Sequence, residues 1–195
     1  MALGRPRAFD MQKALDRALL VFWKKGYEGT SLTDLTRAMR INRPSLYAAF
    51  GNKEELFHKV LDRYVEGRAC YVQEALREPT SRRVAERLLD GTVVHLTDPR
   101  NPGGCLLVQG ALACGEEAGG IRKELAARRM ASEVALRQRF ERARAEGDLP
   151  PRVDPADLAR YLATLIQGLS VQAAGGAARE ELRRVAELVL RSWPG

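Results

Sequence analysis

Apolar residues recur at three- and four-residue spacing along almost the whole chain, and this periodicity limits the possible folds more than any other feature of the sequence. In the segment 10–25 the apolar residues fall on one continuous face of a helix: Met11, Ala14, Leu15, Ala18, Leu19, Phe22 and Trp23. The strict apolar–polar alternation that is typical of β-strands is missing. The sequence therefore predicts an all-α fold.

Capping residues and helix breakers divide this pattern into separate helices. Asp10 is placed to cap the first helix, and Asn52 with Glu55 three residues later resembles a capping box. Gly119 and Gly120 are expected to break the chain before a long charged helix. The predicted helices cover 10–25, 31–39, 42–50, 52–79, 81–97, 105–114, 121–146, 154–173 and 178–192.

Two of these helices are very short and are joined by a tight turn at Arg40 and Ile41. Neither can bury much area alone, so both depend on the longer helices before and after them. This arrangement is typical of a helix-turn-helix unit, in which the second short helix enters the major groove of DNA. Leu46 and Phe50 of that second helix are spaced to face inward. The first quarter of the chain is therefore a candidate DNA-binding unit.

The remaining side chains of the second short helix suit this role. Arg43, at the helix start, can bind a guanine edge or a phosphate. Ser45 and Tyr47 offer hydroxyls to phosphates, and Ala48 is small enough to let the helix sit deep in the groove. Lys53 adds a charge at the N-terminus of the next helix, where backbone N–H groups already favour a phosphate. The alternative is a solvated helix that carries an Arg and a Tyr without a DNA-binding role.

The distribution of charge along the sequence also favours a DNA-binding role for the first quarter of the chain. The formal net charge is +7 and the isoelectric point is about 9.7, which favours an anionic partner. Residues 1–55 hold ten Lys and Arg against six Asp and Glu, so the first quarter carries more than half of the excess. Double-stranded DNA is the first candidate partner on this ground.

Two segments of the sequence resemble the TetR/AcrR family of bacterial regulators. They are Gly26-Tyr27-Glu28-Gly29-Thr30-Ser31-Leu32-Thr33-Asp34-Leu35 and Ser45-Leu46-Tyr47-Ala48-Ala49-Phe50-Gly51-Asn52-Lys53-Glu54-Glu55-Leu56. The resemblance implies an all-α homodimer of about nine helices, with a DNA-binding domain over 1–52 and a ligand-binding and dimerisation domain over 53–195. It also implies a transcriptional regulator, usually a repressor that a small-molecule effector releases from a palindromic operator.

The opening residues 4–10 are similar to the N-terminal arm of many family members. Arg43 and Pro44 depart from the family pattern, where Lys followed by Gly or Ser is usual, and these departures affect the base contacts. With the arm and both short helices included, the candidate DNA-binding residues are Arg5, Arg7, Thr30, Ser31, Thr33, Arg43, Pro44, Ser45, Tyr47, Ala48 and Lys53.

The second part of the chain is expected to hold the effector and the dimer interface. The segments 154–173 and 178–192 are apolar on wide faces, which favours a four-helix bundle built from two protomers, although ordinary core helices are the alternative. The resemblance, together with the small residues of 103–120, predicts an effector pocket lined by the helices at 81–97, 105–114, 121–146 and 154–173. The identity of the effector is left open.

Several other classes of protein fit less well. The three cysteines form no C-x-x-C pair and both histidines are isolated, so we expect no metal site and no cofactor. An enzyme is disfavoured because no nucleophile or acid–base set is present. Without a long apolar run or an apolar block behind Arg7, we expect neither a membrane span nor a secretory signal, and a cytoplasmic location. An effector-independent DNA-binding or architectural protein remains the alternative function.

Overall fold

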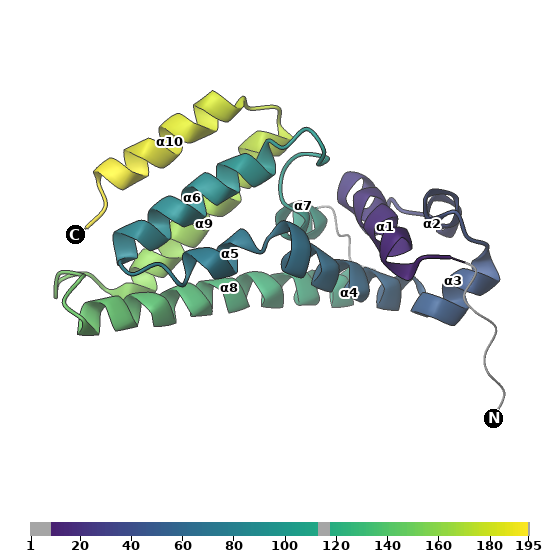
Figure 1. The fold of residues 1–195 in the computed structure, drawn as a ribbon, viewed down its shortest axis with the longest axis horizontal. Coiled ribbons are helices and arrows are strands. Elements are labelled where there is room, and N and C mark those ends of the chain that lie inside the picture. Colours follow the sequence, from purple (N-terminus) through teal and green to yellow (C-terminus); the bar gives the residue numbers. More distant parts are fainter. Residues whose placement is uncertain (1–8, 113–117, 195) are drawn as a thin grey trace.

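The computed structural model describes residues 9–112 and 118–194, and within them the chain forms helices and loops without any strand (Figure 1). The all-α prediction is thereby confirmed. The elements are α1 (Met11–Lys25), α2 (Leu32–Met39), α3 (Arg43–Phe50), α4 (Lys53–Arg63), the π-helical segment η1 (Tyr64–Arg68), α5 (Tyr71–Ala75), α6 (Ser81–Leu96), α7 (Leu106–Leu112), α8 (Gly119–Ala145), α9 (Pro155–Ala174) and α10 (Arg179–Arg191). None of these helices combines the length and apolar character that a bilayer crossing requires.

The helix starts follow the capping residues. The Asp10 carboxylate accepts hydrogen bonds from the backbone N–H groups of Gln12 and Lys13 at 3.0 and 3.1 Å. Asn52 and Glu55 form the expected reciprocal capping box at the start of α4. Each bond satisfies a backbone donor that the first helical turn leaves without a partner.

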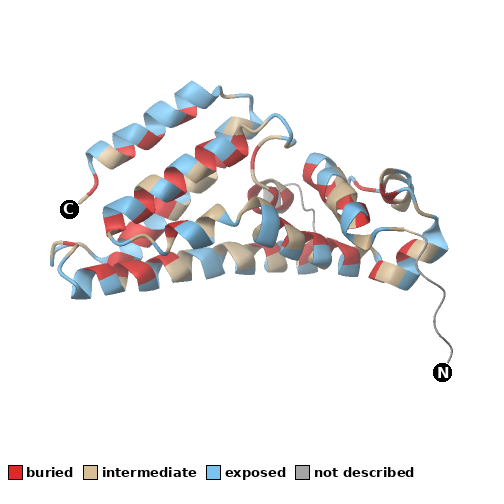
Figure 2. Ribbon diagram, in the orientation of Figure 1, coloured by how far each residue is buried: buried red, intermediate tan, exposed pale blue. Residues whose placement is uncertain are grey.

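The molecule is elongated, with α1, α2 and α3 at one end and α6, α9 and α10 at the other, and α8 runs from the second end through the middle (Figure 1). Two apolar clusters follow this division, and Figure 2 shows buried residues on the inward sides of the helices at both ends. The first cluster lies among α1–α4 and also takes in residues of α7 and the start of α8. The second lies among α5, α6, α8, α9 and α10. The division of the chain at residue 52 stays a prediction, because the first cluster extends beyond it.

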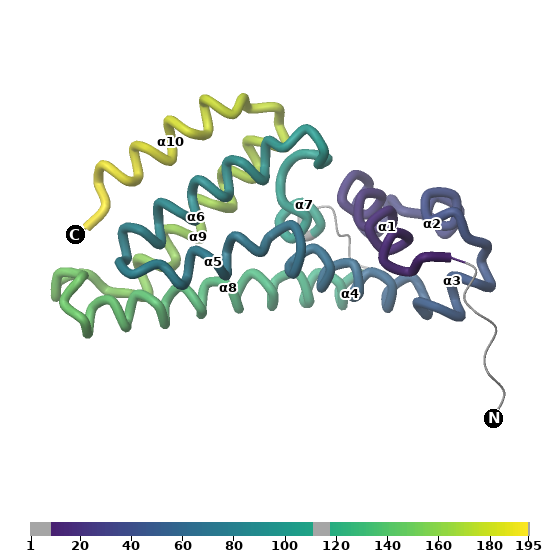
Figure 3. The backbone as a smooth tube through the Cα atoms, in the orientation of Figure 1, coloured from purple at the N-terminus to yellow at the C-terminus, as the bar shows by residue number. Residues whose placement is uncertain are grey.

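The structure differs from the prediction in two places. The helix predicted over 52–79 is divided into α4, η1 and α5, so the described residues form ten α-helices instead of about nine. The chain nevertheless continues in roughly one direction through this region (Figure 3). Gly119 and Gly120 do not break the chain but open α8, and a Cβ at Gly119 would meet nothing within 4 Å.

Candidate nucleic-acid interface and helical-domain cavity

The turn between α2 and α3 is built by the backbone at Arg40. This residue adopts the left-handed conformation, with φ 58° and ψ 44°, directly after the last residue of α2. Asn42 then caps α3, because its side-chain oxygen accepts a hydrogen bond from the Ser45 N–H at 2.8 Å. The sharp reversal sets α3 at an angle to α2 and leaves one side of α3 at the surface.

The buried side of α3 fixes which residues face outward. Leu46 and Phe50 are buried in the first apolar cluster, as expected from their spacing. Arg43, Pro44, Tyr47 and Ala48 are therefore exposed, whereas Ser45 is half-buried. Tyr47 is 49% exposed, which is high for a large aromatic side chain. The exposed residues of α3 thus combine a cation and a phenol with the small Ala48.

Two cations border this face. The Arg43 Nη2 donates a hydrogen bond to the Thr33 hydroxyl at 3.2 Å, which links the first turn of α3 to the first turn of α2. The Lys53 Nζ lies 4.5 Å from the centre of the Tyr27 ring, at the N-terminus of α4. Partial burial lowers the pKa of Lys53 from its usual value. Both side chains are thus held by a neighbour at the edge of the exposed face.

Thr30 does not belong to this surface. Its side chain is buried, and its hydroxyl donates to the Gly26 carbonyl at 2.6 Å at the end of α1. The assignment of Thr30 to the DNA-binding residues stays a prediction, and its buried side chain points toward a structural role at the end of α1. Ser31 is exposed, and its hydroxyl forms the α2 capping box with Asp34. Arg5 and Arg7 lie outside the described residues.

Asp34 also joins α2 to α1. Its carboxylate accepts a hydrogen bond from the Lys25 Nζ at 2.7 Å, and this bond is the main reason that the pKa of Asp34 lies well below its usual value. The carboxylate is therefore ionised across the physiological range.

Comparison with known proteins identifies both parts of this chain. Residues 14–60 match the family described as bacterial regulatory proteins of the tetR family. Residues 82–189 match the family described as the tetracyclin repressor-like C-terminal domain. The chain belongs to the TetR family of transcriptional regulators.

Relatives and solved structures agree with this assignment. The transcriptional repressor ComR of Escherichia coli is 38% identical over 194 residues, with 98% of this chain and 92% of ComR covered. The repressor BdcR of the same organism is 30% identical, with 92% and 86% covered. A cysteine mutant of the TetR-family regulator CifR, solved with a 26-bp double-strand operator DNA, is 46% identical with a TM-score of 0.93, and covers 97% of this chain and 100% of its own.

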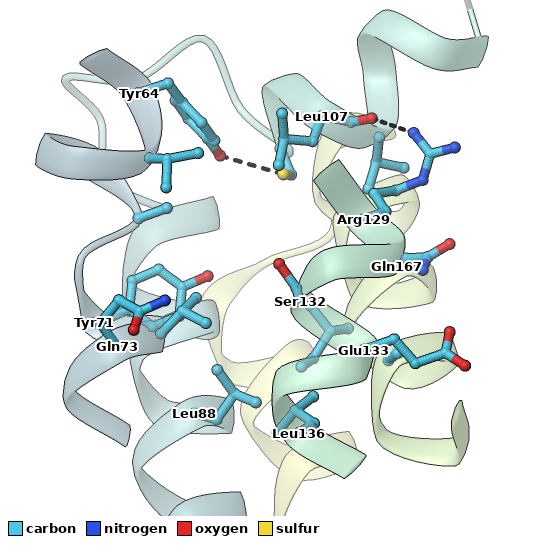
Figure 4. Close-up of a pocket in the computed structure, with 17 residues that line it drawn as sticks. Tyr64, Tyr71, Gln73, Leu88, Leu107, Arg129, Ser132, Glu133, Leu136 and Gln167 are labelled. Atoms are coloured by element: carbon cyan, nitrogen blue, oxygen red, sulfur yellow. Dashed lines mark hydrogen bonds between the residues drawn. The ribbon is translucent and has the colours of Figure 1, made fainter. Parts of the chain in front are cut away.

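This TetR-family regulator has a cavity of about 120 Å³ in its helical part (Figure 4). The four segments predicted to line an effector pocket all contribute. The lining residues include Leu88 on α6, Leu107 on α7, Leu136 on α8, and Ala163, Ile166 and Gln167 on α9. The sequence analysis missed the wall formed by η1 and α5. That wall exists because the π-helical segment ends the regular α4 and turns new residues toward the bundle.

Three polar side chains meet beside the cavity. The Tyr64 hydroxyl lies 2.7 Å from the His95 Nε2. It donates to the Cys105 Sγ at 3.2 Å, the bond drawn from Tyr64 in Figure 4. Burial lowers the pKa of His95 to about 4 and raises the pKa of the Cys105 thiol. All three groups are therefore uncharged near neutral pH. The sequence carried no signal for this cluster, because its members come from three separate segments.

Proposed function

We propose that this TetR-family regulator is a repressor that binds a palindromic operator as a homodimer, with α3 in the major groove. The exposed face of α3 carries the proposal, since a helix that shows Arg43, Tyr47 and Ala48 to solvent has the shape and chemistry of a groove-reading element. The operator complex of CifR supports it, because CifR is 46% identical and shares the fold over nearly the whole chain.

Roles follow from the position of each side chain. We assign phosphate contacts to Thr33, Tyr47 and Lys53, which surround the outer face of α3. Arg43 contacts a base edge or the adjacent phosphate, and its bond to Thr33 orients it before DNA binds. The other contacts of this surface are assigned to Ser31, Pro44, Ser45, Ala48 and, in the N-terminal arm, Arg5 and Arg7.

A titration of single variants against two DNA duplexes tests this assignment. One duplex carries the sequence that the protein selects from random DNA, and the other is a scrambled duplex of equal length. Tyr47→Phe and Lys53→Ala should weaken binding to both, and loss of Lys53 should reduce the salt slope by about one unit. Lys123→Ala, on the exposed side of α8, is the matched control for loss of a charge.

Arg43→Ala separates the two roles of Arg43. A guanine contact predicts a loss of about 1–3 kcal/mol on the selected duplex only, with relaxed preference at one position of each half-site. An equal loss on both duplexes would make Arg43 a phosphate contact. Wild-type binding by Arg43→Ala, Tyr47→Phe and Lys53→Ala alike would show that α3 does not read DNA.

The dimer is assigned to α9 and α10. Four large apolar side chains on these helices are at least 40% exposed: Tyr161, Val171, Val185 and Leu188. A groove between the two helices is open beside Gly168, where a Cβ would meet nothing within 4 Å. Exposed apolar residues gathered on two adjacent helices favour burial against a second copy.

The cavity is assigned to the effector. A ligand that fits only one of two dimer conformations shifts the protein toward that conformation, and release follows when the two α3 helices no longer match the half-sites. Because the proposed function is the regulation of genes, we infer a cytoplasmic location and a regulator without enzymatic activity. If one compound releases the selected duplex but not the scrambled one, the alternative of an effector-independent architectural protein is excluded.

A further inference from the structure

The cavity is built to take an uncharged ligand of small size. Its volume of about 120 Å³ is close to the roughly 150 Å³ of an engineered apolar cavity that holds benzene. Most of its wall is aliphatic, with Leu88, Leu107 and Leu136 among the lining residues. The rings of Tyr64 and Tyr71 form one side and face α8 across the space (Figure 4). The space therefore suits one aromatic ring.

The tyrosine side of the cavity carries no charge. Burial raises the pKa of Tyr71 well above its usual value, and it keeps the Tyr64 phenol protonated as well. The hydroxyls of Tyr71 and Ser132 line the cavity and are neutral groups that can form hydrogen bonds with a small alcohol. Ser132 donates to the Arg128 carbonyl at 3.2 Å and still has a free acceptor site, and Tyr71 accepts from Thr92 at 3.4 Å and keeps its own proton for a ligand.

The two charged side chains of the wall lie away from the tyrosine side (Figure 4). The Arg129 Nη1 donates to the Leu107 carbonyl at 2.6 Å, which holds the guanidinium beside α7. Glu133 pairs with Arg160 of α9 at 3.1 Å, and its carboxylate points away from the tyrosine side (Figure 4). A charged group placed on the tyrosine side would lose its water without gaining a counter-ion there, which is costly.

We propose that the ligand of this cavity is a compact uncharged molecule about the size of one aromatic ring, with at most one hydroxyl or carbonyl group. The inference rests on the proposed function only in naming this ligand as the effector. Binding by the protein alone and release of DNA are separate observables, so the two ideas can fail separately.

Three compounds with one carbon skeleton test the charge preference. Benzyl alcohol, benzoate and benzylamine differ mainly in the charge of the substituent. Isothermal titration of the full-length protein should show benzyl alcohol binding at least tenfold more tightly than either ion. Equal or tighter binding of benzoate or benzylamine overturns the proposal.

Two variants place the binding in the cavity. Ala163→Phe, on the α9 wall, should abolish binding of benzyl alcohol, whereas Ala131→Phe on the exposed side of α8 should keep it. If Ala163→Phe does not fold, ring size gives the same test on the wild-type protein, since 1-naphthylmethanol should bind at least tenfold more weakly than benzyl alcohol. Equal binding of the two alcohols contradicts the size limit.

DNA release is then measured on the selected duplex by fluorescence anisotropy. Binding of benzyl alcohol without release leaves the ligand class standing and removes the effector role. Release by a charged or a two-ring compound that Ala163→Phe blocks keeps the effector role and overturns the ligand class.

Discussion

Burial controls the protonation of single side chains around His95. The imidazole is packed between the rings of Trp23 and Tyr71 and contacts the Tyr64 hydroxyl. Its pKa falls to about 4, mainly because the charged form would lose water, with the nearby Arg68 charge acting in the same direction. Since the single Tyr64 proton is donated to the Cys105 Sγ, the Tyr64 oxygen is left to accept from the imidazole Nε2, and burial keeps that imidazole neutral.

His95 should therefore make the stability of the protein depend on pH. Its folded pKa of about 4 lies below the usual 6.5, so its contribution is complete above pH 6.5 and is lost as the pH falls toward 4. The shift corresponds to about 3 kcal/mol. Urea unfolding of His95→Gln between pH 7 and 4 should show a flatter curve than the wild type. Parallel curves for the two proteins would mean that His95 is not the titrating group.

The backbone of Arg40 is held in the left-handed conformation, which costs free energy for a residue other than glycine. Among the described residues it is the one non-glycine residue with a positive φ, and the turn of the helix-turn-helix unit requires that conformation. Arg40→Gly should raise the free energy of unfolding by up to about 1 kcal/mol, and Arg40→Val should lower it by more than about 1 kcal/mol. Denaturant titration checks both. A valine variant as stable as the glycine variant would contradict the role of the backbone here.

At the scale of elements, α4, η1 and α5 connect the DNA-binding end to the cavity. Arg63, the last residue of α4, binds Asp16 of α1 through two bonds of 2.8 and 3.2 Å. The next residue, Tyr64, lines the cavity. Adjacent residues therefore contact α1 of the DNA-binding end and the cavity, and the change from α- to π-helical geometry falls between them.

The packing of α5 on α6 sets the position of the Tyr71 wall. A Cβ at Gly91 of α6 would overlap the Tyr71 ring. Gly91→Ala should lower the free energy of unfolding by about 1–3 kcal/mol through overpacking, and should reduce the cavity. Gly119→Ala is the matched control, because its Cβ enters open space at the start of α8, and it should be neutral or slightly stabilising. Denaturant titration measures both, and equal effects would argue against the close approach.

Local sequence rules predicted most of these elements. Caps such as Asp10 and Asn52 marked helix starts, and the spacing of Leu46 and Phe50 gave the correct inner face of α3, because these signals act over a few residues. The π-helical segment was missed since it keeps nearly the same apolar spacing as an α-helix. The Tyr64–His95–Cys105 cluster was missed because only the folded chain brings the three residues together.

At the scale of the whole molecule, α9 and α10 leave large apolar side chains exposed to solvent in the single protomer. It includes Leu188, which is 59% exposed, and Val185, which is 40% exposed. By contrast Leu169 and Val189 of the same helices are buried inside the protomer. Substitutions at the exposed residues can therefore test the dimer without disturbing the fold of each protomer, whereas substitutions at the buried residues would disturb that fold.

Leu188→Glu and Val185→Glu should split the proposed dimer, because each puts a charge into an apolar interface. Sedimentation velocity at micromolar concentration should show a monomer with unchanged helix content, together with weaker operator binding. Met130→Glu on α8, at a site of similar exposure, is the control and should stay dimeric. A monomeric wild type, or dimeric Leu188→Glu and Val185→Glu variants, would contradict the assignment to α9 and α10.

The long helix α8 has a consequence for engineering. It has 27 residues, about 40 Å at 1.5 Å per residue, and it belongs to both apolar clusters through Ile121 and Leu125 at one end and Leu136 and Phe140 at the other. A chimera that exchanged residues 1–52 between two relatives would graft half of a hydrophobic core onto a foreign remainder. A working chimera should therefore also keep, from the relative that supplies residues 1–52, the α7 and α8 residues that pack in the first apolar cluster.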